Sequence, residues 1–212
     1  PLINWQVVVA LTHYAEEAGS RAGKNIRLTI TTNALTLDAE KTAFINEHMK
    51  NCVLSIDGRP EVHDRMRPDA GGKGSYERVM SSIRKFVAER GNKEYYARGT
   101  FTRHNLDFAD DVMHLAEQGI DQISLEPVVA SDGCGYELHW EDVPAILAEY
   151  ERLALKFAKS REQGRAFNFF HFMIDTEHGP CAYKRLKGCG VGSEYCAVTP
   201  DGDIYPCHQF VG

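Results

Sequence analysis

The sequence predicts an α/β fold, namely part of a parallel βα barrel followed by a small cysteine-rich unit with a β-hairpin. Apolar segments of strand length alternate with amphipathic segments of helix length over residues 1–175, as in a parallel sheet covered by helices. Four of the six cysteines lie in residues 176–212. In the same stretch, the pair Asp201-Gly202 marks a hairpin turn between two short apolar runs.

The predicted elements follow one another as a helix, then strand and helix four times, then a strand. Apolar residues at helical spacing predict helices over residues 5–18, 38–49, 76–90, 105–118 and 140–161. Apolar runs bounded by turn residues predict strands over residues 25–32, 52–56, 95–101, 122–128 and 166–173. We expect Gly19 to end the first helix. Because a helix comes first, we expect a fragment whose barrel lacks its first strands.

Composition and charge narrow the functional class. The 24 basic and 30 acidic residues give a net charge of -6, which argues against a nucleic-acid-binding or anionic-membrane surface. There is no apolar run long enough to span a membrane and no leader with a cleavage site. We therefore expect a cytoplasmic protein without nucleic-acid or membrane partners. The start at Pro1 and the lack of a closing element after Cys207 also predict a fragment.

Polar side chains gather at the predicted carboxyl ends of the strands, where βα barrels carry their chemistry. These residues could hydrogen-bond the ribose, amine or carboxylate of a polar ligand: Asn33, Ser55, Asp57, Thr100 and Glu126. Each also suits an ordinary turn or strand end, as the pair Asp57-Gly58 does. The loop Gly71–Ser75 resembles a phosphate cradle before a helix, but it lacks the P-loop spacing.

Four cysteines near the end of the chain predict a site for metal or sulfur chemistry. They are separated by seven, six and ten residues: Cys181, Cys189, Cys196 and Cys207. An iron–sulfur cluster accepts thiolates at such irregular spacing, whereas structural zinc usually has Cys-x2-Cys pairs. A disulfide framework would need an oxidising compartment, and buried apolar thiols would need no partner. These alternatives remain open from spacing alone.

The hairpin decides which cysteines approach each other. A two-residue loop at Asp201-Gly202 would place Thr199 opposite Ile204 and Cys196 opposite Cys207. A three-residue loop would shift this pairing by one residue.

Several motifs together resemble the radical S-adenosylmethionine enzymes that carry a C-terminal SPASM domain. The segment Ser55–Gly58, followed by Glu61–Asp64 and Arg67, resembles the fourth-strand motif of that family. Pro1–Trp5 resembles the continuation of its Gly-Gly-Glu-Pro motif. Cys189, twelve residues, Gly202, four residues and Cys207 match the opening of the SPASM pattern, Cys-x9-15-Gly-x4-Cys.

Within that family, the segments that begin at Cys181 and Ala197 are most similar to the SCIFF maturases. These enzymes install thioether cross-links in cysteine-rich precursor peptides. The resemblance implies a partial radical S-adenosylmethionine barrel over residues 1–175 and the start of a SPASM domain over residues 176–212. It also implies S-adenosylmethionine, 4Fe-4S clusters, a precursor peptide, and an electron donor such as flavodoxin or ferredoxin.

The resemblance further implies roles for individual residues. A 5′-deoxyadenosyl radical would remove hydrogen from a peptide residue, and a peptide thiolate would join that carbon. Cys189 and Cys207 would ligate the first auxiliary cluster, with Cys181 as an upstream ligand and Cys196 as a bystander or extra ligand. Asn33 and Ser55 would contact the cofactor, and the same strand-end position suggests contacts from Asp57, Thr100 and Glu126.

Two departures from the family pattern bear on activity. The Cys-x3-Cys-x2-Cys motif of the radical-generating cluster is absent from these residues, so we expect the fragment alone to be inactive. His208 follows Cys207 where related sulfatase-maturing enzymes carry Asp, which favours cross-linking over oxidation of serine or cysteine. The alternatives are an enzyme of the sulfatase-maturing type and a non-catalytic zinc–thiolate binding module.

Overall fold

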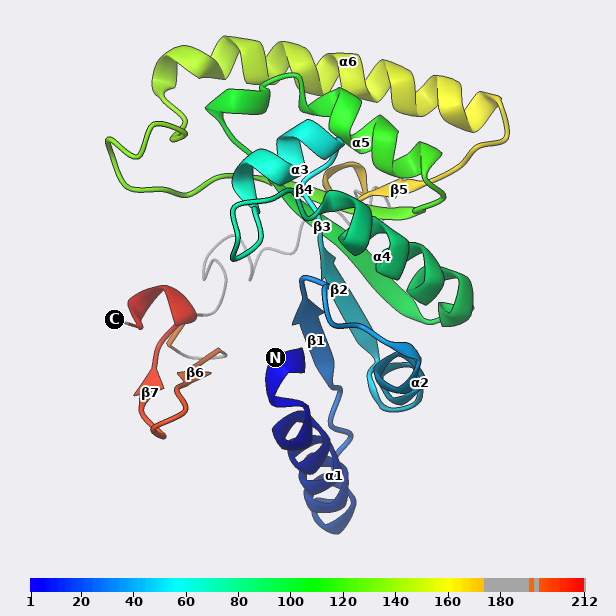
Figure 1. Ribbon diagram of the computed structural model, residues 1–212, viewed down its shortest axis with the longest axis vertical. Coiled ribbons are helices and arrows are strands. Elements are labelled where there is room, and N and C mark those ends of the chain that lie inside the picture. Colours follow the sequence, from blue (N-terminus) through cyan, green and yellow to red (C-terminus); the bar gives the residue numbers. More distant parts are fainter. Residues whose placement is uncertain (174–190, 193–194, 212) are drawn as a thin grey trace. The chain divides into compact units, whose positions relative to one another are not determined.

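The computed structural model describes residues 1–173, 191–192 and 195–211 in two compact units, Pro1–Phe172 and Met173–Gly212. Within the described part of the first unit, five parallel strands form one sheet in sequential order (Figure 1). They are β1 (Thr29–Thr32), β2 (Asn51–Ser55), β3 (Glu94–Phe101), β4 (Gln122–Pro127) and β5 (Asn168–Phe169). This arrangement confirms the predicted α/β fold with a parallel sheet.

Helices connect each strand to the next, as a parallel sheet requires. The connecting helices are α2 (Ala39–His48), α3 (Pro60–Met66), α4 (Tyr76–Arg90), α5 (Phe108–Glu117) and α6 (Val143–Glu162), and α1 (Trp5–Ala22) precedes β1. Helices α5 and α6 run alongside each other (Figure 1). Short 3-10 turns lie at Leu2–Asn4, Arg103–Asn105, Trp140–Asp142 and Phe170–Phe172. None of the helices described here is long and apolar enough to cross a membrane.

The hydrophobic core lies between one face of the sheet and the helices. Along β3, every second side chain from Tyr95 to Phe101 is buried, because alternate residues of a strand point to the same face. Helix α4 contributes an apolar stripe at helical spacing: Val79, Met80, Ile83 and Phe86. The other face of β3 carries the less buried Tyr96, Arg98 and Thr100. The sheet therefore presents a polar face away from its core.

Helix α1 does not end at Gly19, so that prediction was wrong. The helix continues to Ala22, and Gly23 ends it in the left-handed conformation at φ 60°. Gly19 instead permits close packing. A Cβ atom at Gly19 would lie 2.7 Å from Ile26 Cγ1 and 2.9 Å from the Lys24 carbonyl oxygen. A glycine is therefore required here because Lys24 and Ile26 pack closely against the helix, and not because the helix ends at this residue.

The last strand is shorter than predicted. Strand β5 covers only Asn168–Phe169, and a 3-10 turn follows where residues 170–173 were expected to continue it. The aromatic residues of this segment pack edge to face, with ring centroids 5.0 Å apart for Phe169 and Phe172. The apolar run thus reflects an aromatic cluster at a turn, which a sequence pattern cannot distinguish from a strand.

The described part of the second unit contains an antiparallel hairpin of β6 (Ala197–Val198) and β7 (Ile204–Tyr205), then a 3-10 turn at His208–Phe210. Ala197 pairs with Tyr205 and Val198 with Ile204, so the loop has three residues between Thr199 and Asp203. The predicted pairing of Thr199 with Ile204 is therefore wrong, and the hairpin has the register expected for a three-residue loop. Gly202, at φ 90°, supplies the positive φ that this loop requires. Cys196 therefore does not lie directly opposite Cys207.

Candidate functional site

The five polar residues predicted from strand ends all lie at or just after the carboxyl-terminal ends of the strands, on the same side of the sheet. Strands β1 to β4 run in the same direction, so their carboxyl ends meet there. Thr100 and Glu126 are register partners on β3 and β4. The side chains at these carboxyl-terminal strand ends form three small groups, which differ in burial and in hydrogen bonding.

Asn33 and Ser55 lie together in the first group. They line a pocket of about 340 Å³ whose other walls include Pro1–Ile3, Thr31 and Thr36. This volume is at the lower end of the range for small-molecule sites. The hydroxyl and amide groups of the lining residues can donate and accept hydrogen bonds to a polar ligand.

The turn that carries Asn33 is strained. Ala34, which is fully buried, has φ 58°, a left-handed conformation that costs a non-glycine residue about 1 kcal/mol or more. Two side chains hold the turn, because the Ala34 N–H donates to Thr32 Oγ1 at 3.1 Å and the Leu35 N–H to Asn33 Oδ1 at 3.4 Å. Strained residues of this kind cluster at binding sites. Nothing in the sequence marked Ala34 as unusual.

The second group is centred on Asp57, whose side chain is buried. Arg67 donates to both carboxylate oxygens, with Nε at 2.6 Å and Nη2 at 2.9 Å, and the Thr100 N–H donates to Oδ1 at 3.0 Å. The Asp57 oxygens are therefore engaged within the protein. They orient Arg67, which lines a pocket of about 230 Å³ together with Thr100 and Tyr136.

His63, which lies in the segment Glu61–Asp64 of the motif noted above, is buried and contacts the same group. Its Nδ1 accepts from the Asp57 N–H at 3.3 Å, and its Nε2 lies 3.1 Å from Ser75 Oγ, which donates to the Arg67 carbonyl. Burial lowers the pKa of His63 below its usual value, partly opposed by the nearby Asp57 carboxylate. A neutral imidazole can accept from Asp57 and still donate to Ser75.

The loop Gly71–Ser75 has no open anion site at the start of α4. Asp64 accepts from the N–H groups of Ser75 and Tyr76, both at 2.7 Å, so a carboxylate already occupies this helix N-terminus. Asp69 in turn accepts from the N–H groups of Gly71 and Lys73, both at 2.9 Å. The resemblance to a phosphate cradle is therefore explained by internal caps.

The third group links Glu126 to residues that the sequence did not single out. Glu126 accepts from Ser124 Oγ at 2.8 Å and lies 3.0 Å from His171 Nε2, while Tyr150 Oη lies 2.8 Å from His171 Nδ1. Burial opposes ionisation of Glu126, but the hydrogen bonds from Ser124 and His171 outweigh it and lower its pKa. Burial also raises the pKa of Tyr150 to about 12. His171 comes 45 residues after Glu126, so only the fold joins them.

The described cysteines of the second unit lie on either side of the hairpin. Cys207 is buried and Cys196 is exposed, and both are free thiols. His208 Nδ1 lies 3.6 Å from Cys207 Sγ and 2.9 Å from Tyr195 Oη. Cys181 and Cys189, which were predicted as cluster ligands, lie outside the described residues. Thiolates are the donors that iron–sulfur clusters use, and Cys196 and Cys207 are of that donor type.

Comparisons with known proteins identify relatives that modify other molecules. No family model matches the chain. It is 34% identical, over 88% of its length, to a cysteine-type anaerobic sulfatase-maturating enzyme of Clostridium novyi. It is 27% identical, over 86% of its length, to the mycofactocin maturase MftC of Mycobacterium ulcerans. The matches cover 50% and 48% of these relatives, so the chain spans about half their length.

Solved structures show the same fold. The structure of anSMEcpe with bound AdoMet and the Kp18Cys peptide matches 99% of the chain and 58% of that protein, with a TM-score of 0.75 and 17% identity. Streptococcus suis SuiB bound to S-adenosylmethionine matches 88% of the chain and 44% of that protein, with a TM-score of 0.57 and 18% identity.

Proposed function

Because the chain belongs to the radical S-adenosylmethionine enzymes, we propose that it acts in the maturation of a peptide substrate. The relatives at 34% and 27% identity are both named for maturation. The observation that carries the proposal is the collection of polar residues at one strand edge of a sheet with this fold. An electron donor such as flavodoxin or ferredoxin would complete the system.

The proposed cofactor site is the pocket of Asn33 and Ser55. Its volume of about 340 Å³ and its hydroxyl and amide groups fit the polar parts of S-adenosylmethionine. When bound beside a 4Fe-4S cluster, S-adenosylmethionine supplies the radical that removes hydrogen from the substrate. The strained turn at Ala34 would hold the Asn33 amide in one orientation before the ligand arrives, which reduces the cost of ordering on binding.

The neighbouring groups would position the substrate. Asp57 holds the Arg67 guanidinium at the smaller pocket, where it could bind a peptide carboxylate or carbonyl. Glu126 is kept ionised and fixed by Ser124 and His171, so it could accept hydrogen bonds from peptide N–H groups. Direct contacts of Asp57, Thr100 and Glu126 with the cofactor stay predictions.

The cysteines of the second unit would hold an auxiliary cluster. We propose Cys181, Cys189 and Cys207 as ligands, and Cys196 as either an extra ligand or a bystander. Cys207 fits this role because its thiol is buried, and His208 lies 3.6 Å from its sulfur. Hydrogen bonds to ligand sulfurs tune the potentials of such clusters.

Two modifications are candidates for the reaction. In thioether formation, a peptide C–H bond would break and its hydrogen atom would pass to the 5′-deoxyadenosyl radical. A peptide thiolate would then bond to that carbon, and an auxiliary cluster held by the cysteines would accept the one electron released. His208 after Cys207 favours this reaction, as does the similarity of the hairpin to the SCIFF maturases. Oxidation of a serine or cysteine is favoured instead by the 34% identity to the sulfatase-maturating enzyme. The two reactions are distinguished by the product that forms on each kind of substrate peptide.

Mass spectrometry of two peptides tests the proposal. The whole natural protein, reconstituted anaerobically, is given S-adenosylmethionine, a reductant and either a cysteine-rich peptide or a sulfatase-type peptide. A thioether appears as loss of two hydrogens and one free thiol, whereas oxidation of cysteine to an aldehyde removes its sulfur. Cys207→Ala should lose about four irons per protein. Stoichiometric zinc without iron, and neither peptide product, would refute the proposal and favour a zinc–thiolate module.

A further inference from the structure

A cluster of metal-ligating side chains lies on α1 and α2, on different elements from those that form the strand edge. His13 and Glu16 are three residues apart on α1, so they share one face of that helix. His48 is the last residue of α2. One ligand atom from each of the three lies within 4.8 Å of the others.

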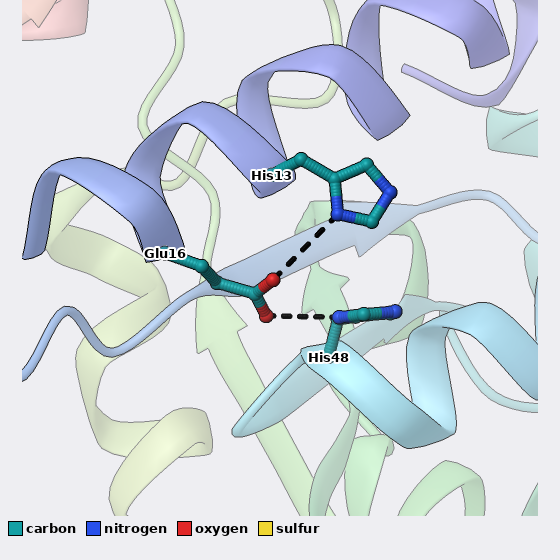
Figure 2. Close-up of side chains that lie close together, drawn as sticks. All are labelled: His13, Glu16 and His48. Carbon is teal, nitrogen blue, oxygen red and sulfur yellow. Dashed lines mark hydrogen bonds and ion pairs between the residues drawn. The ribbon is translucent and has the colours of Figure 1, made fainter. Parts of the chain in front are cut away.

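Figure 2 shows that Glu16 lies between the two imidazole rings, with one carboxylate oxygen toward each. The His48 Nδ1 is 2.8 Å from Glu16 Oε1, and the His13 Nδ1 is 3.7 Å from Glu16 Oε2. Two ligand atoms of a tetrahedral zinc ion, each about 2.0–2.1 Å from the metal, lie roughly 3.3 Å apart. The first separation is shorter than this value and the second is longer, and each goes to a different oxygen of Glu16. With all three ligand atoms within 4.8 Å of one another, rotation of the side chains would be needed to place them around one ion.

Neighbouring side chains hold both rings in place. Phe44 packs against His13 and His48, with ring centroids 5.7 Å and 4.3 Å away. Glu47 Oε2 lies 3.8 Å from the His48 Nε2, the nitrogen that points away from Glu16. This separation is too long for a hydrogen bond, but it leaves a carboxylate near the second nitrogen, where a zinc-bound imidazole usually donates to one.

We propose that His13, Glu16 and His48 bind one divalent transition-metal ion of the zinc class and thereby clamp α1 to α2. Two imidazoles and one carboxylate are a known zinc ligand set, with a fourth position left for water. Helix α1 already packs against Phe44 of α2 through Trp5, with ring centroids 5.2 Å apart, and only Thr12 and Gly19 among its 18 residues are buried, so a bound ion would add a second attachment. The site is independent of the proposed cofactor and cluster chemistry.

The test titrates Zn²⁺ into the full chain and compares single variants. Cysteine thiolates also bind zinc, but they are common to all variants and cancel in the comparison. We expect His13→Gln and His48→Gln each to lose one zinc per chain, or to weaken that site at least about tenfold. His104→Gln is the matched control, because His104 is exposed and hydrogen-bonded to Arg65 away from the cluster. It should bind as many zinc ions as the natural chain.

Hydrogen exchange provides a second readout that does not depend on stoichiometry. Zn²⁺ should slow amide exchange in α1 in the natural chain and in His104→Gln, but not in His48→Gln. The absorption spectrum of the natural chain with Co²⁺, minus that of His48→Gln with Co²⁺, should show nitrogen and oxygen ligation. It should show no thiolate charge-transfer band. The proposal is overturned if His48→Gln and the natural chain bind equal zinc, or if zinc leaves α1 exchange unchanged.

Discussion

The ion pair of Asp57 and Arg67 should contribute strongly to the free energy of unfolding of the protein. Asp57 is 2% exposed, and Arg67 donates to both of its oxygens at 2.6 Å and 2.9 Å. Asp57→Asn keeps the shape but removes the charge, and its amide group then faces the guanidinium. A hydrogen bond with a charged partner contributes about 1.5–3 kcal/mol. We therefore expect a loss of about 2–3 kcal/mol, or several degrees in Tm.

A double-mutant cycle in urea measures this coupling directly. The unfolding free energies of Asp57→Asn, Arg67→Gln and the double variant give the interaction energy, which we expect to be about 1.5 kcal/mol or more. The control pair is Arg21 and Glu17 on α1, which is 3.2 Å apart but exposed. Glu17→Gln should change stability by less than about 0.5 kcal/mol. The reasoning fails if both pairs show the same coupling.

Three further predictions concern other parts of the first unit. Gly99→Ala would place a Cβ 2.4 Å from the Ile56 carbonyl oxygen, so we expect a loss of about 1–3 kcal/mol in urea unfolding; an unchanged midpoint would contradict this. Arg90→Met removes the guanidinium that donates to the Met49 and Lys50 carbonyls after α2, and to the Ile45 carbonyl, which keeps its bond from the Met49 N–H. Stability should fall by about 3 kcal/mol or more, and a smaller loss than for Glu17→Gln would refute this. The Arg152 hydrogen bond lowers the pKa of Asp110 to about 2, against burial. Its contribution is thus present above the unfolded pKa near 3.8 and lost as pH falls toward 2, and Asp110→Asn should flatten this dependence in acid-denaturation curves.

The order and type of the elements followed from local pattern. Hydrophobic periodicity depends on each segment alone, and the alternation of strands and helices leaves a parallel sheet as the simple arrangement. The strand-end positions of Asn33 and Ser55 were predictable for the same reason, because parallel strands end at one edge. The cysteine spacing and the Asp201-Gly202 turn were likewise visible in the sequence.

Tertiary structure alone decided where elements end and which distant residues meet. Gly19 was predicted to end a helix, but the close packing of Ile26 is the reason for a glycine at this position. The hairpin register differed by one residue, because both loop lengths suit the same sequence.

The contacts of the candidate sites also depend on the fold. His171 reaches Glu126 across 45 residues, and His48 reaches Glu16 across 32. Such contacts arise from packing between segments, which local propensity does not encode. The sequence by itself therefore determined the class of fold and the family, whereas the partners of each polar side chain depended on how the segments pack.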